Sequence, residues 1–284
     1  MAIFFFVSGY FFSPKGSFRE FVVNKFWKLL VPLYMFGSLG ILESVLLGGE
    51  PLTERLVGIL VQIGGKADAM WFFACLFTVE ILFYWVWKAS ERLCSGSVWA
   101  LLGFTGLLIA AGIILCALKI KLPWHIETAC VVELFFLGGH LCRKSGLEKK
   151  VRLWGCLIAW LAYAVLIYFF PNPVDMHLDK FGSIFLFYVQ AALGTYAFMS
   201  LAVLLTGKGG KANAFVVWVG QNTIQYFFFQ GTLITITCKL LSIAGITAGS
   251  SLAVSLLCAL AIYVVLCVPA WIVRRYLPIF LGRR

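Results

Sequence analysis

Charged side chains are scarce in this sequence. They make up only 12% of its 284 residues, whereas 62% are hydrophobic, and an ordinary soluble domain carries about a quarter charged residues. A soluble domain is therefore excluded, because lipid must solvate much of the chain. The apolar runs continue over nearly 20 residues without alternating, which is typical of membrane helices and not of barrel strands. The sequence predicts an all-α, polytopic integral membrane helical bundle.

Metal-binding patterns are missing as well. The nine cysteines form no CxxC pair and do not cluster with the three histidines. We therefore expect no metal site, and we interpret the cysteines as small buried hydrophobic residues. Acidic residues are few, 12 against 23 basic ones, which gives a net charge of +11. The basic residues lie in short clusters between apolar runs, where they orient helices, so nucleic-acid binding is excluded.

Nine apolar segments divide the chain, and we predict a single membrane domain over residues 1–284. The longest polar connection contains an amphipathic stretch, Leu52–Ile63, that is expected at the membrane interface. The first segment has about 12 residues against the roughly 20 needed to span a bilayer, and we expect that a preceding helix is missing from this sequence. The segments fall at about 1–12, 29–47, 70–87, 97–118, 123–141, 152–170, 181–206, 214–238 and 243–268.

The loop charges alternate along this segmentation. The loops after the first, third, fifth and seventh segments, with the C-terminal tail, carry a summed charge of +14, whereas the loops between them sum to +1. Basic loops stay in the cytoplasm under the positive-inside rule. We therefore expect the C-terminus in the cytoplasm and Met1 on the outer side.

Four glutamates lie within or at the ends of apolar segments. A carboxylate at a lipid-facing helix centre costs about 2.5–3.5 kcal/mol on insertion scales, so we expect Glu43 and Glu80 to face the helix bundle. For all four, a functional site and a structural pair between helices are both open interpretations. The four are Glu43, Glu80, Glu127 and Glu133.

His125 and Glu127 follow a Pro-Trp pair at the outer end of a segment. We interpret them as a solvated helix cap at the interface, with substrate contact as the alternative. His140 lies at the cytoplasmic end of the same segment, beside Arg143, and is interpreted as interfacial.

A second polar cluster lies in the eighth segment. Positions 222, 225 and 226 fall on neighbouring faces at helical spacing, so the cluster could line a cavity or provide hydrogen bonds between helices. Aromatic residues, 17% of the chain, are assigned to lipid contact and interface anchoring. The cluster comprises Gln221, Asn222, Thr223, Gln225 and Gln230.

Lys25 and Lys28 lie on one helical face where a membrane helix enters from the cytoplasm. Basic residues at such a place usually bind lipid phosphate. The alternative is that they receive the phosphates of a cytosolic donor.

Several motifs in order resemble the acyltransferase 3 family of membrane O-acyltransferases, over nearly the whole chain. A Phe-Phe-x-x-Ser-Gly-Tyr stretch at residues 4–10 precedes Lys25-x-x-Lys28-Leu-x-x-Pro32, as in that family. Within the family, the chain looks most like the bacterial branch that acetylates sugars of surface glycans. The other matching motifs are Met-Trp-Phe-Phe at 70–73, Pro-Trp-His-Ile-Glu-Thr at 123–128, Phe-Phe-Leu-Gly-Gly at 135–139 and Gly-Gln-Asn-Thr at 220–223.

The resemblance implies about ten transmembrane helices in the bacterial inner membrane, in contact with membrane lipid. It implies transfer of an acyl group, commonly acetyl from cytosolic acetyl-CoA, to a hydroxyl of a cell-surface or lipid-linked carbohydrate. The expected site residues are Ser8 and Glu80 for catalysis, Lys25 and Lys28 for acyl-CoA, and Glu127, Asn222 and Gln230 for the acceptor.

The chain departs from the family pattern in three ways. No residue aligns with the essential His of the family's first helix, Lys replaces the more usual Arg at both basic positions, and Gln230 stands where many relatives have His. We expect that this chain without the His-bearing helix does not transfer acetyl groups. A transporter or flippase of a glycan or small acid, in which the same polar residues line a path, is an alternative function. A non-catalytic remnant is another.

The predicted topology is testable with reporter fusions. We expect periplasmic reporter activity from a fusion in the 171–180 loop and cytoplasmic activity from one after Arg284, because the summed loop charges differ so strongly. Alkaline phosphatase and a fluorescent protein are suitable reporters. Cytoplasmic activity at 171–180, or periplasmic activity after Arg284, would refute the topology.

Overall fold

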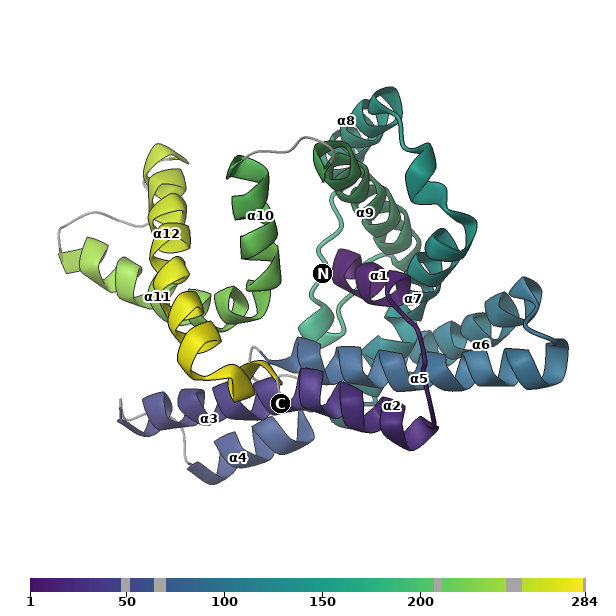
Figure 1. Ribbon diagram of the computed structural model, residues 1–284, viewed down its shortest axis with the longest axis horizontal. Helices are drawn as coiled ribbons and strands as arrows, with labels where there is room; N and C mark the ends of the chain where they lie inside the picture. The colour runs from purple at the N-terminus through teal and green to yellow at the C-terminus, as the bar shows by residue number, and fades with distance from the viewer. Residues whose placement is uncertain (47–51, 64–69, 207–210, 244–251, 283–284) are drawn as a thin grey trace. The chain divides into compact units, whose positions relative to one another are not determined.

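The computed structural model describes residues 1–46, 52–63, 70–206, 211–243 and 252–282, and within these ranges it contains helices and no strand (Figure 1). It divides into two units, residues 1–209 and 210–284. The first unit contains α1 (Ala2–Tyr10), α2 (Phe18–Lys25), α3 (Val31–Leu46), α4 (Leu52–Val61), α5 (Trp71–Cys94), α6 (Val98–Ala117), α7 (Ile126–Ser145), α8 (Leu153–Phe169) and α9 (Ile184–Thr206). The second contains α10 (Lys211–Gln221), α11 (Thr223–Ile243) and α12 (Leu252–Tyr276).

Several helices are long and apolar enough to cross a membrane. The described residues provide five such spans, and a bent pair within α11 makes a sixth if it is counted as one span. The expected all-α membrane bundle is thus confirmed. The five are Trp71–Cys94, Val98–Ala117, Pro123–Ser145, Ile184–Leu205 and Ala253–Tyr276.

The segmentation is accurate for most helices and wrong in the second unit. One continuous segment at 214–238 is wrong, because the helix breaks at Asn222 between α10 and α11. The Asn222 side-chain amide donates to the carbonyl of Trp218 at 2.6 Å, and such local side-chain bonds compete with helix continuation. The last segment, expected at 243–268, is seen as α12 at Leu252–Tyr276.

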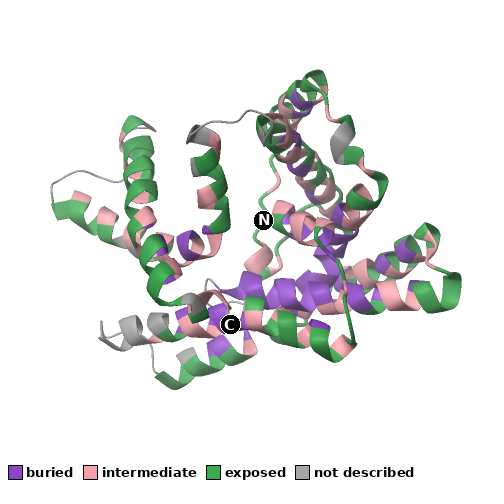
Figure 2. Ribbon diagram, viewed as in Figure 1, coloured by how far each residue is buried: buried purple, intermediate pink, exposed green. Residues whose placement is uncertain are grey.

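The buried residues gather on α5 and α7 (Figure 2). α6 and α8 instead expose most of their apolar side chains, as expected of helices that face lipid. Aromatic rings fill much of the core, with Phe83 centred 4.9 Å from Phe12 and 4.8 Å from Phe136. Assigning the aromatic residues mainly to lipid contact therefore missed an internal aromatic cluster.

α1 and α7 approach each other so closely that only glycine fits at two positions. A Cβ atom on Gly9 would overlap the carbonyl oxygen of Phe136, and one on Gly139 would overlap that of Phe6. Small residues of this kind let membrane helices bring their backbones into contact. Both glycines belong to the motifs noted in the sequence, which gives those motifs a packing role.

Substitution of these glycines tests the close approach. We expect Gly9→Ala and Gly139→Ala each to lower stability by about 1–3 kcal/mol, because the backbones must separate to admit a methyl group. Thermal unfolding of the purified protein in detergent measures the effect. Gly106→Ala on α6 is the matched control, since nothing lies within 4 Å of the added Cβ. Equal melting temperatures for all three variants would contradict the packing argument.

Candidate functional site

The first polar feature of unit 1 is an ion pair between α2 and α5. The Lys25 ammonium lies 2.6 Å and 2.5 Å from the two carboxylate oxygens of Glu80. The side chains are 21% and 4% exposed, respectively. The prediction that Glu80 faces the bundle is confirmed, and the structure joins a residue expected at the donor site to one expected in catalysis. The side chain of Glu43, on α3, lies outside the described residues.

Local sequence places Lys25 at this depth. Ser17 and Glu20 form a capping box, in which the Ser17 hydroxyl accepts from the Glu20 amide at 3.3 Å and the Glu20 carboxylate accepts from the Ser17 amide at 3.2 Å. α2 then runs to Lys25, and the chain continues as a π-helical turn, Phe26–Leu30. π-helical turns are rare in proteins, and those that do occur are often found at functional sites. Lys28 lies on this turn, exposed and without an ion pair among the described residues.

Glu133 is the second buried acid near this pair. It is fully buried on α7, and neither carboxylate oxygen has a hydrogen-bond partner in the described part of the chain. It lies within electrostatic range of Glu80. Cys75, buried on α5, lies within such range of both Glu133 and Glu127. Unit 1 therefore buries two acidic side chains on neighbouring helices, Glu80 on α5 and Glu133 on α7.

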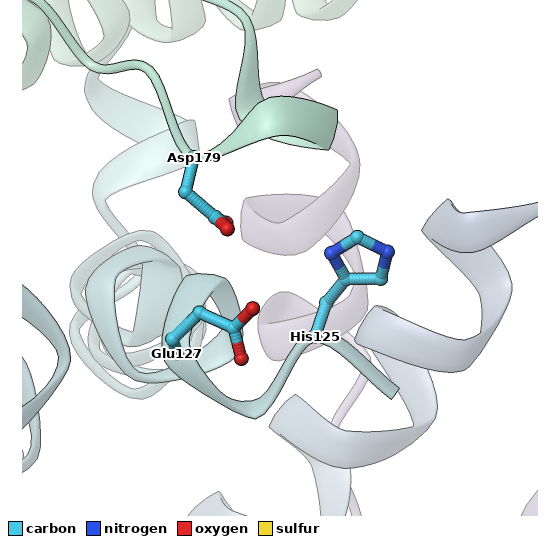
Figure 3. Close-up of side chains that lie close together, drawn as sticks. All are labelled: His125, Glu127 and Asp179. Carbon is cyan, nitrogen blue, oxygen red and sulfur yellow. The ribbon is translucent and has the colours of Figure 1, made fainter. Parts of the chain in front are cut away.

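The turn before α7 carries a second polar cluster (Figure 3). His125, Glu127 and Asp179 each present one possible ligand atom, and these atoms all lie within 4.8 Å of one another. His125 and Glu127 are fully buried. Their interpretation as a solvated cap is therefore wrong, because the 176–178 turn and Asp179 cover the start of α7 in a contact remote in sequence.

The backbone at this turn is held in an unusual conformation. Trp124 and His125 have φ angles of 58° and 53°, and a left-handed conformation costs a residue other than glycine about 1–3 kcal/mol. Contacts on both sides fix Trp124: its indole nitrogen donates to the Leu60 carbonyl at 3.0 Å, and its carbonyl accepts from the Thr78 hydroxyl at 3.2 Å. The left-handed turn directs the His125 ring into the protein.

Asp179 joins the loop to α7 and to the segment before it. Its carboxylate pairs with the Lys121 ammonium and accepts from the Thr128 hydroxyl. Glu127 accepts from the Leu122 amide at 3.1 Å through Oε2. The second Glu127 oxygen and both ring nitrogens of His125 have no hydrogen-bond partner among the described residues.

A cavity of about 980 Å³ lies beside this cluster. Trp71, at the start of α5, and His177 line it, and their rings stack with centroids 5.8 Å apart. The His125 ring lies behind them, 5.3 Å from that of Trp71 and 5.8 Å from that of His177. Gln190 of α9 adds an amide to the wall. A stacked aromatic surface with amide groups around it suits a polar ligand that has an apolar face.

The remaining expected site residues are not members of these two clusters. Ser8 is half-buried on α1, next to the closely packed Gly9. In the second unit, Asn222 is fully buried and its amide is used at the helix break, whereas Gln230 lines a separate cavity of about 370 Å³. Within the described residues, no hydrogen bond joins Asn222 to Gln230. The Asn222 side-chain oxygen instead accepts from the Gln225 side-chain amide at 3.4 Å.

The sequence did not reveal four residues in or beside the cluster of His125, Glu127 and Asp179. They are Trp71, which forms part of the cavity wall, Lys121, His177 and Asp179. Asp179 lies 52 positions after Glu127, so no spacing rule connects them. A signal did exist for Trp71, which opens a recognised motif, and the acidic and histidine residues of the 171–180 connection stood out in an otherwise apolar chain.

Comparison with known proteins gives one match. A family model described as an acyltransferase domain matches residues 1–273. No curated protein and no solved structure matches the chain.

The Lys25–Glu80 ion pair is testable by a double-mutant cycle. We expect Lys25→Met and Glu80→Met each to lower stability by about 1–3 kcal/mol, because each strands a charge whose partner is gone. The double variant should regain most of that loss, since it buries no unpaired charge. Thermal unfolding in detergent provides the readout. Lys15→Met, at an exposed lysine, is the control, and additive losses in the double variant would argue against coupling.

Proposed function

Because the chain belongs to the acyltransferase family whose model covers residues 1–273, we propose that it transfers an acyl group from cytosolic acyl-CoA to a hydroxyl of a cell-surface or lipid-linked carbohydrate. Acetyl is the proposed acyl group. The family match carries the proposal. The proposed location is the bacterial inner membrane, with the C-terminus in the cytoplasm, and the loop charges support that orientation.

Lys28 is the proposed contact for the donor. It is exposed on the π-helical turn, whereas the neighbouring Lys25 is held by Glu80 and lies over the Phe21 ring at 5.6 Å. An ammonium group binds phosphate as a point charge, without the two-pronged geometry of arginine. The phosphates of acyl-CoA thus meet a free cation at Lys28, and Lys25 connects that entrance to the buried carboxylate of Glu80.

The proposed reaction transfers the acyl group from the thioester sulfur of the donor to the hydroxyl oxygen of the acceptor. The acceptor hydroxyl oxygen attacks the thioester carbonyl carbon, the carbon–sulfur bond breaks, and the departing CoA thiolate takes up the proton that the hydroxyl releases. A positioned base speeds such a step by about 10²–10⁴-fold. Glu80 and Ser8 are the proposed catalytic residues, and the burial of Glu80 and the half-buried position of Ser8 support their assignment to the polar interior.

The acceptor is proposed to bind in the cavity beside Trp71 and His177. Aromatic rings pack against the apolar faces of sugars. The Gln190 side-chain nitrogen donates to the Phe170 carbonyl at 2.7 Å, and its side-chain oxygen is the atom proposed to accept from a hydroxyl. Glu127 lies behind this wall. The acceptor contacts expected at Asn222 and Gln230, which belong to the second unit, stay predictions from the sequence.

The donor contact is tested with paired substrates. We expect Lys28→Ala to raise Kd for acetyl-CoA about tenfold and to leave Kd for acetyl-pantetheine, which has no phosphate, unchanged, because the ammonium contributes only to phosphate binding. Calorimetric titration of the purified protein measures both constants.

Lys144→Ala is the matched control, since Lys144 is exposed and belongs to another basic loop expected on the same side. An equal effect of Lys28→Ala on both donors would remove Lys28 from phosphate binding. Failure of the purified protein to bind acetyl-CoA would contradict the proposed acyl transfer, because the donor would have no site.

A further inference from the structure

Three side chains of metal-binding type converge at the start of α7. His125 and Glu127 come from the left-handed turn and the first helical turn, and Asp179 comes from the loop that follows α8 (Figure 3). One imidazole nitrogen and two carboxylate oxygens lie within 4.8 Å of one another. Such convergence from two segments 52 residues apart is not produced by any local motif.

Several polar atoms of this cluster have no hydrogen-bond partner among the described residues of the protein. His125 is fully buried, and neither of its ring nitrogens has a hydrogen-bond partner among the described residues. The same holds for Oε1 of Glu127. A buried polar group without a partner costs about 1–3 kcal/mol, and native structures satisfy nearly all such groups through protein, water or a bound ion. Acceptor atoms predominate here, so a cation satisfies more of them than a single water does.

We propose that His125, Glu127 and Asp179 bind a divalent transition-metal ion, with Zn²⁺ as the best match. Zn²⁺ takes imidazole nitrogen and carboxylate oxygen at about 2.0–2.2 Å, and its reactive sites use three protein ligands with a fourth position open. Two ligand atoms of a tetrahedral site stand about 3.4 Å apart at these bond lengths. Since the three atoms lie within 4.8 Å of one another, they need to approach by no more than about 1.4 Å, which side-chain rotation can supply. The imidazole ligand disfavours Mg²⁺ and Ca²⁺, which select oxygen.

Lys121 competes with the ion for Asp179. Its ammonium pairs with one Asp179 oxygen, while the Thr128 hydroxyl donates to the other. The lysine thus compensates one of the two carboxylate charges and weakens the attraction for a second cation. We therefore expect the affinity for Zn²⁺ to rise when the charge of Lys121 is removed. A purely structural hydrogen-bond network would not show this response.

The ion would tie the loop of residues 171–183 to α7. His177 of that loop lines the 980 Å³ cavity, so metal binding fixes one wall of the cavity. The sequence predicted no metal site, so the proposed Zn²⁺ site differs from that expectation. The Zn²⁺ site does not depend on acyl transfer.

The experiment measures Zn²⁺ binding directly. The full chain is purified in detergent, stripped with a chelator, and titrated with Zn²⁺ by calorimetry, with bound metal counted by elemental analysis after desalting. We expect one Zn²⁺ per chain, a higher melting temperature with Zn²⁺, and no displacement by Mg²⁺ in large excess. His125→Gln should weaken binding at least tenfold, since it removes the only nitrogen ligand.

His140→Gln is the matched control, because it makes the same change on the same helix away from the cluster, and its Zn²⁺ affinity should equal that of the parent. Glu127→Gln is a second test variant, so loss of fold in one variant leaves the other informative. Lys121→Met should bind Zn²⁺ several-fold more tightly.

Fewer than one Zn²⁺ per chain, or unchanged affinity in both folded ligand variants, would overturn the site. Unchanged or weaker binding by Lys121→Met would remove Asp179 from the ligand set.

Discussion

The fold of the first unit depends on the requirement that acidic groups in an apolar bundle turn away from lipid, and two of them, Glu80 and Asp179, have partners within the protein. Lipid offers no hydrogen bonds, so a buried carboxylate orients its helix toward whatever polar group can reach it. Glu80 meets Lys25, and Asp179 meets Lys121 and Thr128. These pairings determine which faces of α5 and α7 point inward, and the aromatic core then fills the space between them.

Two different polar arrangements occur in the first unit, one between α2 and α5 and one at the turn before α7. At one place a lysine from a short amphipathic helix reaches a carboxylate directly, and the pair is complete. At the other, around His125, a strained turn brings polar atoms inward and leaves several of them without a protein partner. Complete pairs are typical of structural links, whereas incomplete ones at strained backbone mark places where a ligand supplies the missing contact. The proposed metal site follows from this contrast.

Sequence patterns were sufficient for the features that depend on local or one-dimensional properties. Apolar run length identified α6 and α8 closely, and the cost of an exposed carboxylate gave the orientation of Glu80. Patterns failed where tertiary contacts decide: Asn222 breaks a helix through its own side chain, and Asp179 covers a turn that looked solvated. The aromatic cluster was likewise missed, because composition alone does not distinguish a ring against lipid from a ring in the core.

The backbone contact between α1 and α7 has a consequence for how the chain is made. Gly9 leaves the ribosome about 130 residues before Gly139, an interval of about 7–26 s at ordinary rates of synthesis. During that interval Gly9 on α1 has no α7 backbone to pack against. Correct assembly of this protein therefore includes a waiting period, in which a temporary neighbour, lipid or an insertion factor, must occupy the place that α7 later takes.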